Sequence, residues 1–540
     1  MTFTLDSHAA RSCPVKTYNA YSGQSAENSG PPTRFPGSAL FERKVNQALR
    51  TAYPAAQPLE AGPDRNNDEA ACLAAMDAGA KLIFDGQLPR DLATHRCGRV
   101  PVLVRDEDNR GYYPVLVKYQ RVTEKATAGC CEYSTLADPT AHHQAEGRRV
   151  RWSWRPGTAL QLAHYWLLLQ ASGHAGERAL GGVVGIDEFA EVGPVITWIG
   201  LDEPSIKSNG DLISPLQLYL REFCKRVEIA ERAQTGDPQL GAEMLPIISR
   251  ECDSCGWQSP CAERLDPDDL SLRMAKTPLD PEQITVLREA GVSTCAQFAE
   301  LDLDVFLPAR LPLMGSRSGA EERIRTAQRR SRLMLAGVEL ERTTTGKLAL
   351  PQAALEIDID LETSRDDRVY LWGFWVDDKA RSKQFYRPFA RFEPLDQAAE
   401  LALAKEALGW LRDLAGGADA LVYHYSDYET VRINRLAAGG DPELGWAKEY
   451  AQTNFVDLFA IMRANYFSVH GLGLKTVACS ATGFRWRDSD PGGLNSMRWF
   501  EDAVSGKTPA IREQARKRVL EYNEDDVRAT WSLRRWLGKQ

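Results

Sequence analysis

The chain has 540 residues, with 66 Lys and Arg against 74 Asp and Glu and a formal net charge of −8. Hydrophobic residues make up 43% and charged residues 26%, as in ordinary globular proteins, which excludes disordered, collagen-like and coiled-coil classes. The sequence has no uninterrupted apolar run of about 18 residues and no basic segment leading into an apolar run at its start. We therefore expect a cytoplasmic protein without a membrane span. The pI of about 5.7 argues against a uniformly basic nucleic-acid coat but allows local basic grooves.

The first half of the chain mixes helix and strand patterns. Gly, Ser and Pro predict a loop over residues 20–38. Two apolar runs around the polar tip Asp-Glu-Asp-Asn predict a β-hairpin, and residues 181–200 alternate as strands do. The hairpin strands are expected at 98–105 and 112–122, and helices at 41–50, 66–79, 158–170 and 215–233.

The second half begins with a helical stretch and then returns to a mixed pattern. Residues 276–340 predict helices, and the turn at Gly291 resembles a helix–hairpin–helix, with a plain helical linker as the alternative. Strands at 355–363, 368–376 and 420–425, a helix at 396–415 and further helices follow. The order predicts a mixed α/β (α+β) fold. We expect domains at 1–275 and 349–540, joined by a connector over 276–348.

Eleven cysteines need an explanation in a reducing compartment, where stable disulfides are not expected. Seven are scattered and are interpreted as small buried hydrophobic residues. The run Cys252-x2-Cys255-x5-Cys261 places three thiols on a tight turn, where they can bind one metal ion or cluster. Cys13 is the candidate fourth ligand. Thiolates accept both iron and zinc, so a structural zinc site is the simplest alternative to a cluster.

The predicted strand Leu355–Thr363 carries acidic residues at every second position: Glu356, Asp358, Asp360 and Glu362. Period-two spacing places all four on one face of the strand. Four like charges repel one another unless solvent or cations compensate them. A metal site is therefore favoured over a solvated edge strand.

Further carboxylates follow in the same region. Tyr522 and Asp526 are four residues apart and share one helix face, whereas Asp525 points about 100° away and is expected to face solvent. Glu429, after Tyr428, and Asp427 are competing candidates for an additional acid. Asp457 either faces the site or caps a helix.

The cysteine arrangement resembles that of the iron-staple nucleases of the RecB/AddB type. Gln161-x3-Tyr165 and Lys118 also match motifs of that family. The resemblance implies a restriction-endonuclease-like N-terminal domain in which the four thiols hold a 4Fe–4S cluster. Pro101 and Leu116 stand where the family has metal-binding carboxylates, so the nuclease centre of this domain is expected to be degenerate.

The C-terminal motifs resemble those of DEDDy exonucleases with the RNase H-like fold. Together, the two halves are similar to the RecB-like nuclease family that carries a YprB-type RNase H-like domain. This resemblance implies a 3′–5′ exonuclease that uses Mg²⁺ or Mn²⁺ to hydrolyse DNA or RNA. Asp360, Glu362 and Asp526 are the implied metal ligands, Glu429 binds directly or through water, and Tyr522 orients the attacking water.

Basic residues beside the Tyr-x3-Asp motif are expected to contact a nucleic acid, preferably single-stranded. They are Arg512, Arg516, Lys517 and Arg518. Some members of the family carry a helicase, but this sequence has no phosphate-loop motif, so a helicase is a candidate partner. The alternative function is a catalytically inactive nucleic-acid-binding scaffold with an iron–sulfur cluster. A zinc-stabilised adaptor without a nucleic-acid role is a third hypothesis.

Overall fold

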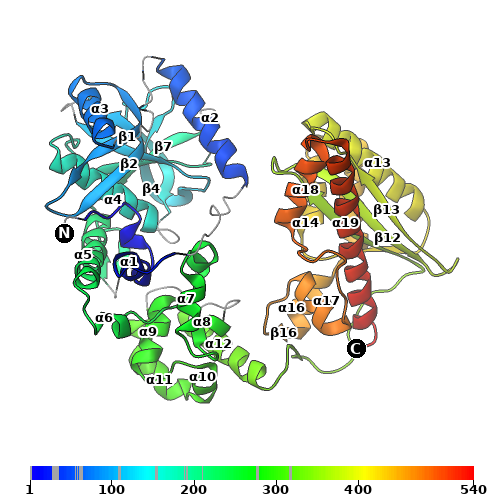
Figure 1. Ribbon diagram of the computed structural model, residues 1–540. Coiled ribbons are helices and arrows are strands. Elements are labelled where there is room, and N and C mark those ends of the chain that lie inside the picture. The colour runs from blue at the N-terminus through cyan, green and yellow to red at the C-terminus, as the bar shows by residue number, and fades with distance from the viewer. Residues whose placement is uncertain are drawn as a thin grey trace. The chain divides into compact units, whose positions relative to one another are not determined.

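The structure is a computed structural model that divides into two compact units, residues 1–328 and 329–540 (Figure 1). The division falls within helix α12 (Ala320–Leu335). Each unit has its own sheet and is described by itself. The described residues are 3–26, 36–54, 56, 59, 65–107, 111–151, 156–187, 189, 193–208, 211–274, 279–314 and 319–540.

The N-terminal unit is built on a seven-stranded sheet in the order β1-β2-β3-β6-β7-β4-β5. The predicted hairpin is confirmed, since β2 and β3 pair antiparallel with Val102 opposite Val115. Strands β3 and β6 pair parallel. Strands β1, β4 and β5 were not predicted, and the polar, mostly exposed faces of the β4–β5 hairpin explain why β4 and β5 lack a clear apolar alternation. The strands are β1 (Leu82–Asp91), β2 (Arg96–Arg105), β3 (Tyr112–Val117), β4 (Thr123–Thr135), β5 (His143–Val150), β6 (Leu180–Val184), β7 (Val195–Gly200) and the short pair β8 (Ile206–Ser208) and β9 (Asp211–Ile213).

Helix α4 is a core helix of this unit. Both its apolar and its polar side chains are buried along most of its length. It packs on the sheet through Leu162, Leu168 and Leu169, which join the core cluster around Ile83 and Val100. The predicted loop lies between α1 and α2, and its residues 27–35 fall outside the described part of the chain. The helices are α1 (Pro14–Tyr21), α2 (Pro36–Ala52), α3 (Arg65–Asp77), α4 (Pro156–Ala171), α5 (Pro215–Gln234), α6 (Leu240–Glu243), α7 (Gln258–Glu263) and α8 (Leu270–Arg273).

The helical stretch after residue 279 contains α9 (Pro281–Glu289), α10 (Cys295–Glu300), α11 (Leu303–Arg310) and α12. Its hairpin turn has few amides left for a phosphate. Gln297 Oε1 accepts from the backbone N–H groups of Ser293 and Thr294 at 2.8 and 3.1 Å. The Asp268 carboxylate accepts from the Ala296 N–H at 2.9 Å. These bonds favour the linker interpretation over a helix–hairpin–helix that grips a nucleic acid.

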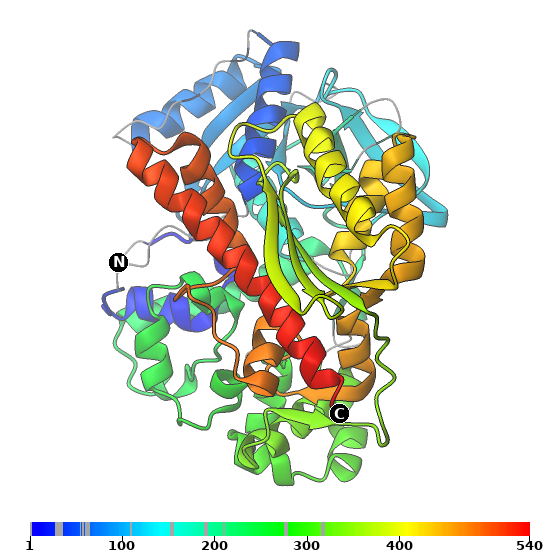
Figure 2. The ribbon, with the colours of Figure 1, turned by 90° about the vertical axis from the view of Figure 1, so that its right-hand side faces the viewer.

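The C-terminal unit contains a five-stranded sheet in the order β13-β12-β11-β14-β15. Strand β11 pairs antiparallel with β12 and parallel with β14. Alternate residues of β11 divide between two faces, so Ile357, Ile359 and Leu361 join a core with the helix α13. The acidic residues point to the other face, and the long helix α19 packs on that side against β11 and β12 (Figure 2).

The strands predicted in this unit are confirmed, and together the two units confirm the predicted mixed α/β fold. Four strands were not predicted: β10, β15 and β16 have only three residues each, and β13 (Lys383–Ala390) is an edge strand with Lys, Gln, Arg and Pro on a partly exposed run. The remaining strands are β10 (Leu340–Arg342), β11 (Leu355–Thr363), β12 (Val369–Asp378), β14 (Ala420–His424), β15 (Phe455–Asp457) and β16 (Tyr466–Ser468). The helices are α13 (Gln397–Ala415), α14 (Tyr428–Ala437), α15 (Pro442–Asn454), α16 (Leu458–Asn465), α17 (Leu474–Thr482), α18 (Gly493–Ser505) and α19 (Pro509–Leu537).

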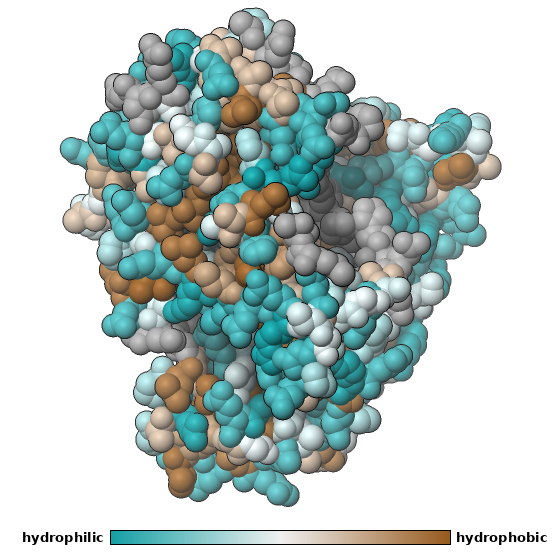
Figure 3. All heavy atoms as spheres, turned by 60° about the vertical axis from the view of Figure 1, so that its left-hand side comes forward, coloured by the Kyte–Doolittle hydropathy of each residue, from teal (hydrophilic) through white to brown (hydrophobic). Residues whose placement is uncertain are grey.

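Hydrophilic residues cover much of the face drawn in Figure 3, and hydrophobic residues appear there in separate groups. Within the described ranges, no helix combines the length and the apolar character needed to cross a membrane.

Candidate functional site

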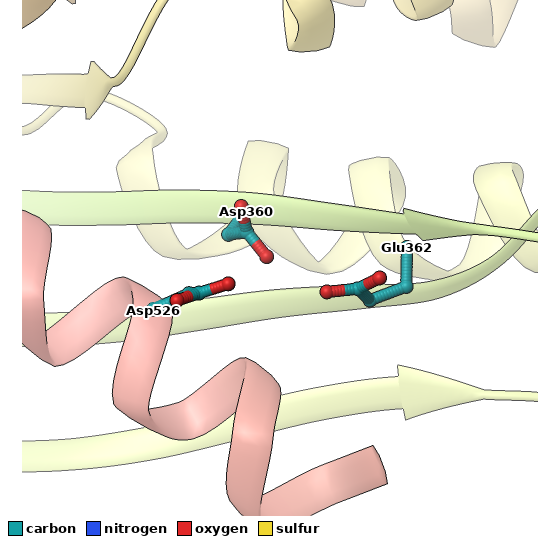
Figure 4. Close-up of side chains that lie close together, drawn as sticks. All are labelled: Asp360, Glu362 and Asp526. Carbon is teal, nitrogen blue, oxygen red and sulfur yellow. The ribbon is translucent and has the colours of Figure 1, made fainter. Parts of the chain in front are cut away.

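Three carboxylates converge in the C-terminal unit. Asp360 and Glu362 come from β11, and Asp526 comes from α19, with ligand atoms that all lie within 4.8 Å of one another. The three side chains point toward one common space (Figure 4). Among the described residues, this is the only group of three His, Cys, Asp or Glu side chains that lie so close together.

The cluster carries strong electrostatic repulsion. Burial, followed by the charges of Asp526, Glu362 and Glu429, raises the pKa of Asp360 well above its usual value. Burial, followed by the charge of Asp526, raises the pKa of Glu362 to about 8. A divalent cation would compensate this charge, and carboxylate oxygens are the ligands that Mg²⁺ and Mn²⁺ prefer. The donor set therefore fits such an ion.

The other two acidic residues of β11 are neutralised inside the unit. Arg534 of α19 donates to both oxygens of Asp358, at 3.1 and 2.9 Å, and also contacts Glu356. The ammonium of Lys379 lies 2.7 Å from Glu356. The metal site predicted for the whole acidic face is therefore confined to the half that contains Asp360 and Glu362.

Each carboxylate of the cluster accepts a hydrogen bond from a neutral side chain on a different element. The donors are Asn523 Nδ2 to Asp360 at 2.7 Å, Ser496 Oγ to Glu362 at 2.5 Å and Trp486 Nε1 to Asp526 at 2.6 Å. Asn523 is buried against Gly373 of β12, where an added Cβ would lie 1.6 Å from Asn523 Oδ1. Only a glycine therefore allows α19 to approach the sheet so closely.

Tyr522 and Asp526 share one face of α19, as the four-residue spacing predicted, and Lys475 of α17 joins them. Lys475 Nζ lies 2.9 Å from the Tyr522 hydroxyl and 3.3 Å from Asp526 Oδ1. Burial and the neighbouring carboxylates raise the pKa of Tyr522, so its hydroxyl keeps its proton at neutral pH. The role of Lys475 was not predicted, because neither its spacing nor its residue type marks it as part of an acidic site.

The expectation that Asp525 faces solvent is wrong. Its side chain is buried and accepts from the backbone N–H and Nε of Arg487, at 2.8 and 2.9 Å. Helical periodicity gives the direction of a side chain but does not tell which segment covers that direction. Here the loop between α17 and α18 covers it.

The three candidates for the additional acid have different environments. Glu429 is buried at the start of α14, and its charge acts on Asp360 and Glu362. Its Oε2 makes no hydrogen bond within the described residues and lies 3.6 Å from His424 Nδ1. Asp427 is exposed at the N-cap of the same helix. Asp457 accepts from the N–H groups of Phe459 and Ser426, at 2.8 and 3.0 Å, as a capping residue does. This geometry favours Glu429.

The predicted nucleic-acid-binding residues lie on α19 before Tyr522. Arg518 forms two bonds to Asp488, at 2.5 and 3.0 Å, and stacks on Trp499, whose ring also contacts Tyr522. Arg512 donates to the carbonyl of Gly506 at 2.7 Å, and Arg516 lies over the ring of Phe392. Lys517 is exposed beside Glu521. Of these four residues, Lys517 alone is exposed, and the guanidinium of Arg518 is held by Asp488.

The four predicted cysteine ligands line one small pocket in the N-terminal unit, although Cys13 is far from the others in sequence. Burial raises the pKa of the Cys13, Cys252 and Cys261 thiols. Polar hydrogens point at two of the sulfur atoms, from Asn19 to Cys261 at 3.7 Å and from Ser249 to Cys252 at 3.4 Å. The fourth thiol, Cys255, lies at the C-cap of the short helix that contains Cys252.

The degenerate site predicted in the same unit forms a hydrogen-bonded cluster. Gln161 on α4 accepts from Lys118 Nζ at 3.3 Å and donates to Ser7 Oγ at 3.3 Å. The Ser7 hydroxyl donates to Tyr165 at 2.9 Å. The structure thus brings the three predicted residues together. The two positions without carboxylates lie on the hairpin, Pro101 on β2 and the buried Leu116 on β3.

Comparison with known protein families places the C-terminal unit. A family model described as the RNase H superfamily matches residues 357–538. The match confirms the predicted RNase H-like C-terminal domain, which has a nuclease-type fold. It begins at residue 357, so the RecB-like relationship of the N-terminal unit stays a prediction. No curated protein and no solved structure matches the chain significantly.

Proposed function

We propose that the C-terminal unit is a divalent-metal-dependent nuclease that acts as a 3′–5′ exonuclease on single-stranded DNA or RNA. The observation that carries this proposal is the convergence of Asp360, Glu362 and Asp526 from two elements far apart in sequence. The buried Glu429 supports it, because its Oε2 lies 3.6 Å from His424 Nδ1 without a hydrogen bond, and a bound ion or its water would supply a partner. The match to the RNase H superfamily agrees with this chemistry.

The carboxylates of Asp360, Glu362 and Asp526 would hold the metal, with Glu429 as a further ligand. Bound Mg²⁺ or Mn²⁺ would stabilise negative charge on the phosphodiester and lower the pKa of a water molecule. An ammonium group has no acceptor, so the Tyr522 oxygen accepts from Lys475, and the hydroxyl hydrogen is left for a second partner. Tyr522 thus orients the water or a phosphate oxygen, and the exposed Lys517 contacts the incoming backbone.

The proposal is tested by digestion of single-stranded DNA and RNA with Mn²⁺, with the label at either the 5′ or the 3′ end. Wild type is expected to shorten both from the 3′ end, and Asp360→Ala to leave them intact. Undiminished digestion by Asp360→Ala would contradict the assignment. A wild type inactive on both nucleic acids but able to bind them would favour the alternative, a non-catalytic scaffold.

For the N-terminal unit we propose a structural 4Fe–4S cluster held by Cys13, Cys252, Cys255 and Cys261. Thiolates are the ligands that such clusters use. A tetrahedral zinc site would bring its four sulfur atoms to roughly 3.8 Å from one another, given a Zn–S bond of about 2.3 Å. Thiolates bind both groups, so metal analysis and not the thiol positions distinguishes the cluster from zinc. Because Pro101 and Leu116 offer no ligand, this unit would bind nucleic acid without cleaving it.

The cluster is tested by the absorption near 400 nm and the iron and zinc content of protein purified without oxygen. Wild type is expected to be coloured and to contain iron. Cys255→Ser is expected to lose both, whereas Cys130→Ser, at an exposed cysteine of β4 outside the pocket, keeps them. Colourless protein with bound zinc would contradict the cluster and support the structural zinc site.

A further inference from the structure

The loop between α17 and α18 is fastened to α19 by three consecutive residues. We call the segment Phe484–Asp488 the strap. Trp486 donates to Asp526 at 2.6 Å, Arg487 donates to Asp525 at 2.8 and 2.9 Å, and Asp488 accepts from Arg518 at 2.5 and 3.0 Å. Arg487 also donates to the carbonyl of Glu521 at 2.8 Å. The strap is therefore held along α19 by Trp486 and by the two residues that follow it.

Trp486 is the residue through which the strap reaches the acidic cluster. An indole N–H can only donate, and a short bond from it to a carboxylate belongs to the stronger class of hydrogen bonds. The ring itself is held in place, since Phe484 meets it edge-on at 4.9 Å and Lys475 Nζ lies 5.4 Å from its centre. The direction of the N–H group is thus set by the packing of the strap.

Two donors compete to orient Asp526, and they differ in stiffness. Lys475 carries its ammonium on a flexible four-carbon stem and divides its contacts between Asp526 and Tyr522. Trp486 has only two side-chain torsions and makes the shorter bond. The orientation of Asp526 therefore depends chiefly on Trp486. Without a rigid donor, repulsion from Asp360 and Glu362 would turn the carboxylate away from them.

We propose that Trp486 is a positioning residue that holds the Asp526 carboxylate toward Asp360 and Glu362, so that the three bind a divalent ion as a preformed set. This inference rests on the proposed metal-dependent function. The corresponding donor to Asp360, Asn523, lies within a helix, and so does the donor to Glu362, Ser496. The third donor lies on the strap, so the metal site is complete only when the strap is docked on α19.

The experiment is a calorimetric titration of the full chain with Mn²⁺, in wild type and in Trp486→Phe, which keeps a ring but lacks the N–H. Partners that orient metal ligands typically contribute about 10- to 100-fold in affinity, and a loss of that size is expected. The matched control is Trp531→Phe. Trp531 lies on α19 and donates to a carboxylate outside the cluster, that of Asp377 on β12, at 3.0 Å. That control is expected to bind Mn²⁺ as wild type does.

A second variant separates the N–H group from the shape of the ring. Benzothienylalanine at position 486 preserves the bicyclic shape and lacks the donor, and it is expected to weaken Mn²⁺ binding as Trp486→Phe does. The melting temperature in EDTA is measured for each protein, so that a folding defect is recognised. Mn²⁺ affinity equal to wild type in the benzothienylalanine variant would overturn the inference alone. A wild type that binds no Mn²⁺ would overturn the proposed function and the inference with it.

Discussion

The two halves of β11 carry the same residue types on the same face of one strand, yet their environments are opposite. Glu356 and Asp358 are neutralised by Arg534, which reaches both. Asp360 and Glu362 instead meet a third carboxylate, Asp526. Both partners come from α19, two turns apart. A row of acids therefore becomes a candidate metal site only where the facing helix leaves its charge uncompensated.

The largest expected effect is a difference in nuclease activity between substitutions in the two halves of β11. Asp360→Asn is expected to lower Mn²⁺-dependent nuclease activity by roughly a thousandfold, since a bound metal supplies several kcal/mol of charge stabilisation. Asp358→Asn is the matched change two residues earlier on the same face, and it is expected to remain active. Initial rates on single-stranded DNA measure both. Equal loss in the two variants would mean that the halves do not differ in function.

The next effect concerns the free energy of unfolding, to which the neutralised half of β11 is expected to contribute. Arg534→Met removes the cation between Glu356 and Asp358 and leaves the buried Asp358 carboxylate uncompensated, whereas Glu356 keeps Lys379. The free energy of unfolding is expected to fall by about 3–5 kcal/mol. Urea denaturation measures the change, with Arg535→Met as the control, because Arg535 is exposed and stacks on Trp531. A loss no larger than that of the control would show that the contacts of Arg534 with Glu356 and Asp358 do not stabilise the fold.

Metal binding gives a smaller stabilisation that should act through one half only. Mn²⁺ at about 100 times its dissociation constant is expected to stabilise wild type by about 2.7 kcal/mol. Glu362→Gln should remove this gain, whereas Asp358→Asn should keep it. The melting temperature with and without Mn²⁺ reports the difference. A gain that persists in Glu362→Gln would place the ion elsewhere.

The smallest effect is a pH dependence of the metal-free protein. Burial raises the pKa of Asp358 to about 6 and that of Glu362 to about 8. In each window the folded state binds more protons than the unfolded state, so stability falls as the pH rises. Between pH 6 and 8 the fall comes from the Glu362 half and amounts to ~2 kcal/mol. Urea denaturation in EDTA should show this slope in wild type and a flatter one in Glu362→Gln.

Local patterns predicted much of the C-terminal unit. Alternation over Leu355–Thr363 predicted a strand with its acids on one face, and the spacing of Tyr522 and Asp526 predicted a shared helix face. Both succeeded because the periods of 2 and 3.6 residues are properties of a single element. The edge strand β13 was missed because its alternation is weak where only one neighbour covers it. Lys475 was missed because its partners lie about fifty residues later in sequence.

The sequence by itself determined three of the five strands of the C-terminal sheet, which acids share a face of β11, and which cysteines are close along the chain. It could not tell that Arg534 neutralises Asp358 or that Asn523 binds Asp360. Those partners are separated by more than 150 residues, and no local periodicity connects them. The sequence did offer Cys13 as the candidate fourth ligand, and the structure places Cys13 in the pocket of the other three thiols. Only tertiary packing decides which charges meet. The approach of α19 to the sheet brings Arg534 to one half of β11 and Asp526 to the other.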